Sequence, residues 1–346
     1  MTTVVDLLSS VGVFLFENVI NLSLIGIAAL LISAVLAPIG ALRWWGRRRS
    51  ATQVIVDPLS PAKPAISSEM AEHYIVYLSG IGDISGEYLS PYELQFLDRL
   101  TQHLPQTPIV RDVFAFSVEN LGLTSDRLLS RFWKGIHALK MQKGRFARLS
   151  LLINIRNLIQ VGVSVDRRYG PIYNYGTAEM VLQGLLRQGY QLGSGKPVTL
   201  LGYSGGGQIS LGSARYLKET IKAPLQVISL GGVLSNDPGI EYVDHIYHLY
   251  GAHDSAQALG AILFPGRWPW FSQSLWNKAL GQRKISLLCI GPMAHRGKHS
   301  YMDVHSAFDQ DRNYCDVTVD YIVNIVGEIA LPETKARERT ASSSSI

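Results

Sequence analysis

The sequence predicts an α/β fold in which helices cover both faces of a mostly parallel sheet. Short apolar segments rich in strand-forming residues alternate along the chain with longer segments of helical periodicity. This alternation is typical of βαβ units, whose crossover helices pack on the two faces of a parallel sheet. In addition, one apolar segment at 198–201 leads through a glycine-rich turn directly into a helical pattern. Both observations favour a parallel sheet over a sandwich or a helical bundle.

The expected elements follow one another from residue 74 to residue 329. Strands are predicted at 74–78, 109–116, 198–201, 225–230, 245–250 and 285–290, and helices at 90–104, 177–188, 208–218 and about 317–329. The first of these helices has the clearest start signal. Ser90 is a suitable N-cap, Pro91 occupies the first helical position and Glu93 the third.

The N-terminal region has the features of a membrane anchor. Residues 22–42 include no charged side chain and exceed the roughly 20 residues that a helix needs to cross a bilayer. Trp44 and Trp45 follow, and then three arginines at 47–49. Interfacial tryptophans and a basic flank predict a single-pass helix whose following domain lies on the cytoplasmic side of the membrane.

The rest of the chain divides by composition. Residues 1–49 form the predicted anchor with its basic flank, and the proline- and serine-rich residues 50–70 a linker. Residues 71–331 form the globular domain, with a lid insertion at about 119–172 and a second insertion at about 256–282. The charged and serine-rich residues 332–346 are expected to be disordered.

Composition also excludes several classes of function. Hydrophobic residues make up 47% of the chain and charged residues 17%, which is typical of a membrane-attached protein. The net charge of +5 comes without a basic stripe interleaved with aromatics, so nucleic-acid binding is not expected. Cys289 and Cys315 form neither a disulfide framework nor a metal-binding spacing, and no cofactor is implied. No pattern bears on the oligomeric state.

The glycine-rich turn after 198–201 places a serine between small residues. Gly202, Ser204 and Gly206 match the pattern G-x-S-x-G, and they stand between a predicted strand and a predicted helix. In this pattern the serine occupies a sharp turn, and the glycines leave room for the crossing strand and helix. Ser204 is therefore the candidate nucleophile.

A serine nucleophile needs a base, and histidine is the usual one. In a parallel sheet the site lies at the carboxyl ends of the strands, so the base is sought in a loop that follows a strand. The loop after 285–290 contains His295 and His299. We favour His299, because it directly precedes a segment that looks helical from Tyr301 onward, and we keep His295 as the alternative.

The acid that orients the base is sought by the same rule. Asp254 follows the strand 245–250 and is the favoured candidate. Asp237 follows the preceding strand and is the alternative, although Asp237 before Pro-Gly is also typical of an ordinary turn.

Stabilising a developing oxyanion requires at least two N–H donors. The backbone of Gly205 supplies one, and Gly80 and Ile81, in the loop after 74–78, are well placed to supply the other. The loop 79–86 also contains G-x-G-x-x-x-G, close to the dinucleotide fingerprint. Its spacing differs from that fingerprint, and no acidic residue ends a second strand about twenty positions on, which disfavours nucleotide binding.

The segment Gly-Tyr-Ser-Gly-Gly at 202–206, followed by Asp and then His in loops after successive strands, resembles the α/β-hydrolase superfamily. The resemblance covers about 74–329 and implies a central sheet of about eight strands with a lid. It implies Ser204 as nucleophile, Asp254 as acid, His299 as base, and Ile81 and Gly205 as oxyanion donors. The chain departs from the pattern at its oxyanion loop, where Ser-Gly-Ile-Gly stands in place of a His-Gly motif.

Two insertions bear on the substrate. Residues 124–158 combine lysines and arginines with apolar residues, and residues 258–280 contain three tryptophans and two phenylalanines. Together with the anchor they favour an ester of a lipid or another long acyl chain. The expected function is a membrane-anchored serine hydrolase that forms an acyl-enzyme on Ser204. An acyltransferase or a catalytically inactive membrane scaffold on the same fold is the alternative.

Overall fold

The computed structural model describes residues 70–82, 89–116 and 151–330. The predicted anchor, linker and tail, and most of the predicted lid, lie outside these residues. None of the helices within them is both long and apolar enough to cross a membrane.

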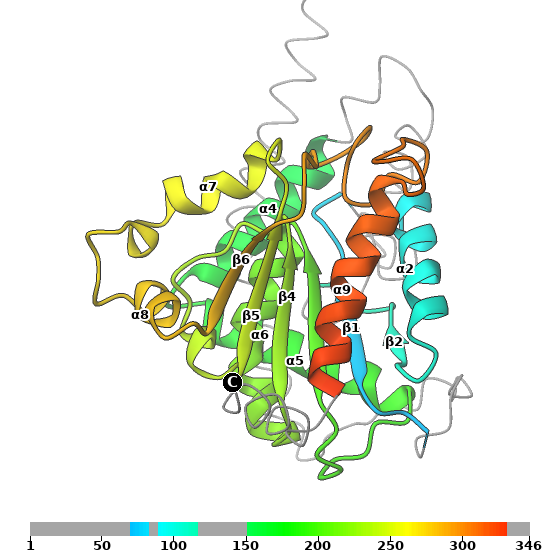
Figure 1. Cartoon of the computed structure of the whole chain (residues 1–346). Coiled ribbons are helices and arrows are strands. Elements are labelled where there is room, and N and C mark those ends of the chain that lie inside the picture. Colours follow the sequence, from blue (N-terminus) through cyan, green and yellow to red (C-terminus); the bar gives the residue numbers. More distant parts are fainter. Residues whose placement is uncertain (1–69, 83–88, 117–150, 331–346) are drawn as a thin grey trace, which may run out of the picture.

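A six-stranded sheet forms the centre of the domain (Figure 1). Its strands are β1 (Tyr74–Leu78), β2 (Ile109–Val110), β3 (Val198–Tyr203), β4 (Leu225–Leu230), β5 (His245–Tyr250) and β6 (Ile285–Cys289). They run in the order β2-β1-β3-β4-β5-β6, and every neighbouring pair is parallel. The predicted parallel α/β sheet is therefore confirmed, and all carboxyl ends lie at one edge, the upper one in Figure 1.

The sheet differs from the expectation in extent. Six strands occur in the described part of the chain, where the resemblance implied about eight. The strand expected at 109–116 has only two residues, because it pairs only with Ile75 and Val76 of β1. Directly after it, the Arg111 guanidinium bonds to the Asp98 carboxylate, the Thr101 hydroxyl and the Leu97 carbonyl. These bonds tie the chain to the helix beside the sheet.

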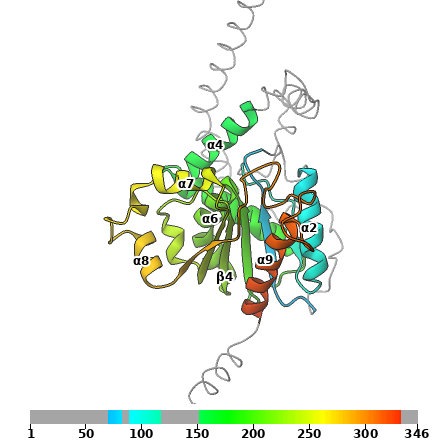
Figure 2. The ribbon, with the colours of Figure 1, turned by 45° about the horizontal axis from the view of Figure 1, so that its top comes forward.

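Helices cover both faces of the sheet, and the strands supply side chains to both cores. The helices are α2 (Pro91–His103), α4 (Leu151–Val165), α5 (Gly170–Arg187), α6 (Gly205–Ile221), α7 (Ser255–Leu263), α8 (Leu275–Gly281) and α9 (Tyr314–Ala330). Helices α2 and α9 pack on one face, whereas α4, α5 and α6 contact one another on the other (Figures 1 and 2). Along β1, Tyr74, Val76 and Leu78 enter the core under α5 and α6. Ile75 and Tyr77 enter the core under α2 and α9.

The start of α2 confirms the capping prediction. The Ser90 hydroxyl accepts from the Glu93 backbone N–H, and the Glu93 carboxylate accepts from the Ser90 backbone N–H. This reciprocal pair satisfies two donors that a helix start otherwise leaves without partners.

The prediction of a helix from Tyr301 onward is wrong. Residues 301–313 form turns, and α9 begins only at Tyr314. The buried carboxylate of Asp303 accepts hydrogen bonds from the backbone N–H groups of His299, His305 and Ser306. A side chain that binds neighbouring backbone donors in this way competes with helix formation.

Candidate active site

Ser204 lies at the sharp turn between β3 and α6. Its φ of 53° and ψ of −122° are unusual for a residue with a side chain. A Cβ on Gly202 would lie 2.5 Å from the Cα of Gly207, and one on Gly206 would lie 2.4 Å from the carbonyl oxygen of Leu78. Glycine is therefore required on both sides of Ser204, as the pattern predicts.

The ring of His295 joins Ser204 to Asp254. Its Nε2 lies 2.9 Å from the Ser204 Oγ, and its Nδ1 lies 2.9 Å from the Asp254 Oδ2. Ser204 follows β3, Asp254 follows β5 and His295 follows β6, so the three residues meet at the carboxyl edge of the sheet. Among these three, only the histidine retains appreciable exposure, with 20% of its side chain accessible.

Of the two histidines in this loop, the structure brings His295 to Ser204 and not the favoured His299. A bridge pairs Ala294 with Ser300, and within the loop that it closes the ring of His295 contacts Ser204. The His299 ring packs on Tyr314, with 5.0 Å between ring centroids. The preference for His299 assumed a helix from Tyr301, and that helix is absent.

The Asp254 carboxylate accepts four hydrogen bonds. Its Oδ1 caps α7 by accepting from the backbone N–H groups of Ala256 and Gln257. Its Oδ2 contacts His295 and also accepts from the Tyr301 hydroxyl over 2.5 Å. Burial acts to raise the pKa of Asp254, but these hydrogen bonds outweigh it and hold the pKa below its ordinary value. The carboxylate is therefore charged and fixed in position.

The alternative acid, Asp237, lies elsewhere. It caps the short 3-10 helix Pro238–Glu241 by accepting from the Gly239 N–H, and it also accepts from the Gln208 side chain. Burial raises its pKa. Asp237 therefore has the local turn role that its sequence context also suggested.

Two tyrosines that the sequence analysis did not single out hold the site together. The Tyr301 hydroxyl, fully buried, donates to Asp254 and accepts from the Gly251 N–H over 2.9 Å. Tyr203 stacks on the His295 ring at 5.5 Å between centroids, and its hydroxyl donates to the His295 carbonyl. Tyr203 could have been noticed as the neighbour of Ser204, whereas no sequence pattern marks Tyr301.

The residues expected to bind the oxyanion lie beside Ser204. A Cβ on Gly205 would lie 2.7 Å from the Ile81 side chain, and one on Gly80 would lie 3.6 Å from the Ser204 Cβ. Gly205 is the first residue of α6, and N–H groups in the first turn have no acceptor within the helix. The buried side chain of Asn157, on α4, donates to the Ile81 carbonyl over 2.8 Å and so anchors this loop.

No protein-family model and no curated protein matches this chain. The site must therefore be interpreted from its own geometry. A serine whose hydroxyl contacts an imidazole, itself held by a charged carboxylate, can lose its proton as it attacks an electrophile. Within residues 70–82, 89–116 and 151–330, no group of three or more His, Cys, Asp or Glu side chains could bind a metal ion.

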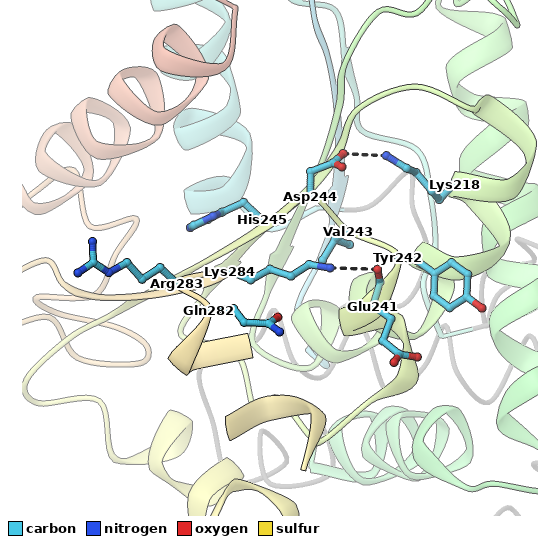
Figure 3. Close-up of a pocket in the computed structure, with 9 residues that line it drawn as sticks. All are labelled: Lys218, Glu241, Tyr242, Val243, Asp244, His245, Gln282, Arg283 and Lys284. Carbon is cyan, nitrogen blue, oxygen red and sulfur yellow. Dashed lines mark hydrogen bonds and ion pairs between the residues drawn. The ribbon is translucent and has the colours of Figure 1, made fainter. Parts of the chain in front are cut away.

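A separate pocket opens at the opposite edge of the sheet, around the amino ends of β5 and β6 (Figure 3). Its lining is strongly charged, but its two lysines bind within the protein. Lys218 pairs with the Asp244 carboxylate over 2.8 Å, and Lys284 donates to the Glu241 carbonyl. Neither lysine is therefore free to bind a ligand there, and the pocket lies at the other edge of the sheet from Ser204. It is lined by Lys218, Glu241, Tyr242, Val243, Asp244, His245, Gln282, Arg283 and Lys284.

Proposed function

We propose that this protein is a serine hydrolase of the α/β-hydrolase type that cleaves carboxylic esters. The observation that carries the proposal is the hydrogen-bonded line from Ser204 through His295 to Asp254. The strained backbone at Ser204 and the parallel sheet beneath it also support the proposal, because a nucleophile of this kind stands at such a turn. In this proposal His295 is the base, whereas the sequence analysis had favoured His299 for that role.

The reaction proceeds through an acyl-enzyme. The Ser204 Oγ attacks the ester carbonyl carbon while His295 Nε2 accepts the hydroxyl proton. The N–H groups of Ile81 and Gly205 stabilise the negative oxygen of the tetrahedral intermediate. The intermediate collapses, the bond to the alcohol breaks, and the imidazolium of His295 donates its proton to that alcohol. Asp254 holds the Nδ1–H side of the ring and stabilises the imidazolium.

Water completes the cycle by the same steps. His295 accepts a proton from water as the water oxygen attacks the acyl carbon, and it then returns the proton to Ser204 as the carboxylic acid leaves. An acyltransferase would use the same acyl-enzyme with another acceptor in place of water. A lipid or another long-chain acyl ester is the proposed substrate class. The aromatic insertion around α7 and α8 supports this choice. The uncharged segment at 22–42 also supports it, and we propose that this segment anchors the protein in a membrane with the domain on the cytoplasmic side.

A covalent fluorophosphonate probe tests the proposal directly. We expect it to label the full chain at Ser204, and Ser204→Ala to abolish both the labelling and the hydrolysis of short and long acyl esters. Equal hydrolysis by the native protein and Ser204→Ala would refute the role of Ser204. Absence of labelling in the folded native chain would favour an inactive scaffold, and ester formation with an added alcohol in place of hydrolysis would favour an acyltransferase.

A further inference from the structure

Five large apolar side chains are exposed together on α7 and the loop that follows it. Their exposed fractions are 44% for Leu259, 65% for Ile262, 60% for Leu263, 73% for Trp270 and 46% for Phe271. Isolated exposed hydrophobic residues are normal, but a cluster within 13 residues indicates an interaction surface. We call these five residues the α7 surface.

The α7 surface carries no exposed charge of its own. Between 255 and 274 the only charged residue is Arg267. Its guanidinium is directed inward, where it donates to the Leu234 carbonyl over 3.0 Å and lies 4.0 Å from the centroid of the Trp276 ring. An acidic partner would therefore find no exposed cation within this segment.

Helix α7, which carries three of the five residues, begins at the candidate active site. Asp254 is the N-cap of α7, so the helix begins at the acid that contacts His295. Figures 1 and 2 show α7 at the edge of the sheet where the site lies, with α4 beside it. On α4, Leu158 is a further exposed apolar residue at 56%. The loop that carries His295 adds two exposed cations, Arg296 and Lys298.

We propose that the α7 surface inserts into the interfacial layer of a lipid bilayer and so brings Ser204 to the membrane surface. Exposed Leu, Ile, Phe and Trp side chains without acidic neighbours are typical of segments that lie in this layer. Arg296 and Lys298 complement anionic headgroups at the same edge of the domain. The uncharged segment at 22–42 and its basic flank, which predict a membrane anchor, would hold the domain close to a bilayer.

This contact would deliver an apolar substrate without its passage through water. Only that consequence rests on the proposed function, because the contact itself does not require catalysis. A second copy of the chain is the competing occupant of the α7 surface, and the experiment separates the two.

A polarity-sensitive fluorophore at position 262 tests the contact in the full chain reconstituted into anionic vesicles. The fluorophore is attached to Ile262→Cys in a variant that also carries Cys289→Ser, because Cys289 is exposed. Cys315 is kept, since it is buried and burial raises its pKa to about 12, which keeps its thiol from reacting with the label. Leu192→Cys is the matched control, since Leu192 is 52% exposed and precedes the amino end of β3 at the opposite edge.

We expect the fluorophore at 262 to be quenched at least about twofold more by bromine on the lipid acyl chains than the fluorophore at 192. Iodide in the water should quench mainly at 192. Equal quenching by iodide at the two positions would overturn the proposal. Shielding of 262 in detergent solution that increases with protein concentration, together with a doubled mass, would instead assign the surface to a second copy.

An activity measurement tests substrate delivery. In the triple variant Ile262→Ser, Leu263→Ser and Trp270→Ser, hydrolysis of an ester embedded in vesicles should fall by about tenfold or more, because three apolar side chains no longer partition into the bilayer. Hydrolysis of a water-soluble short ester should stay within about twofold of the native rate. Equal loss on both esters would refute delivery. Failure of the native chain to cleave either ester would refute the proposed function and leave the quenching result standing.

Discussion

The Tyr301 hydroxyl is the best place to test how the acid is held. Tyr301→Phe removes one oxygen atom from a fully buried side chain and leaves its ring in place. Two hydrogen bonds are lost: the 2.5 Å bond to Asp254 Oδ2 and the 2.9 Å bond from the Gly251 N–H. Asp254 keeps its contact with His295 and both backbone bonds to Oδ1.

The expected cost follows from these contacts. A hydrogen bond to a charged group contributes about 1.5–3 kcal/mol, and a buried N–H left without a partner costs about 1–3 kcal/mol. The two contributions together predict that the free energy of unfolding falls by about 2.5–6 kcal/mol at neutral pH. The kcat should fall by about tenfold, because the freed Oδ2 can tilt and hold the imidazole less well. KM should not change, since Tyr301 has no exposed surface with which to touch the substrate.

The pH dependence supplies a second measurement. The bond from Tyr301 lowers the pKa of Asp254, so it stabilises the fold above the pKa of the unfolded aspartate, and this contribution disappears as the carboxylate is protonated. The difference in unfolding free energy between the native protein and Tyr301→Phe should therefore stay constant down to about pH 4, the ordinary pKa of an aspartate, and shrink as the pH falls further.

Tyr74→Phe is the matched control. Tyr74 is equally buried, but its hydroxyl has no hydrogen-bond partner among the described residues, so its removal should cost nothing. Both variants are compared by urea denaturation and by ester hydrolysis. If Tyr301→Phe were no less stable than Tyr74→Phe and kept the native kcat, the assigned role of Tyr301 would be refuted.

Three further predictions concern the base, a helix and the buried histidines. In an ester assay, His295→Ala should lower kcat by about a thousandfold or more. His299→Asn should leave kcat within about threefold, and asparagine suits the left-handed backbone of this position, where φ is 64°. The reverse result would restore His299 as the base. Gly327→Ala should raise the free energy of unfolding by about 0.5–1 kcal/mol, because Gly327 lies within α9 and a Cβ there would meet no atom within 4 Å; lower stability in urea denaturation would contradict this. Burial lowers the pKa of His73 and of His248 to about 4 from an ordinary 6.5. The unfolded chain therefore binds more protons at intermediate pH, and each histidine should cost up to about 3 kcal/mol of stability as the pH falls from about 6.5 to about 4. Denaturation midpoints at the two pH values measure this loss, and His73→Gln with His248→Gln should flatten it.

Local patterns in the sequence were sufficient to predict the framework of the site. Continuous apolar segments predicted five of the six strands to within two residues. The G-x-S-x-G pattern predicted a strand, a turn and a helix around Ser204, because the packing there excludes any Cβ on its flanks. Asp254, the favoured acid, contacts a histidine in the structure, since a residue directly after a parallel strand must lie at the carboxyl edge of the sheet.

Only the tertiary structure decided which histidine faces Ser204 and what supports the acid. The path of the loop between β6 and α9 depends on the buried carboxylate of Asp303 and on the bridge between Ala294 and Ser300. These contacts turn His295 inward and bring the Tyr301 hydroxyl to Asp254 from 47 residues away in the chain. Strand and turn signals arise between residues near one another in sequence, where periodicity can reveal them. The direction of a loop side chain depends on contacts between distant residues, which no local pattern records.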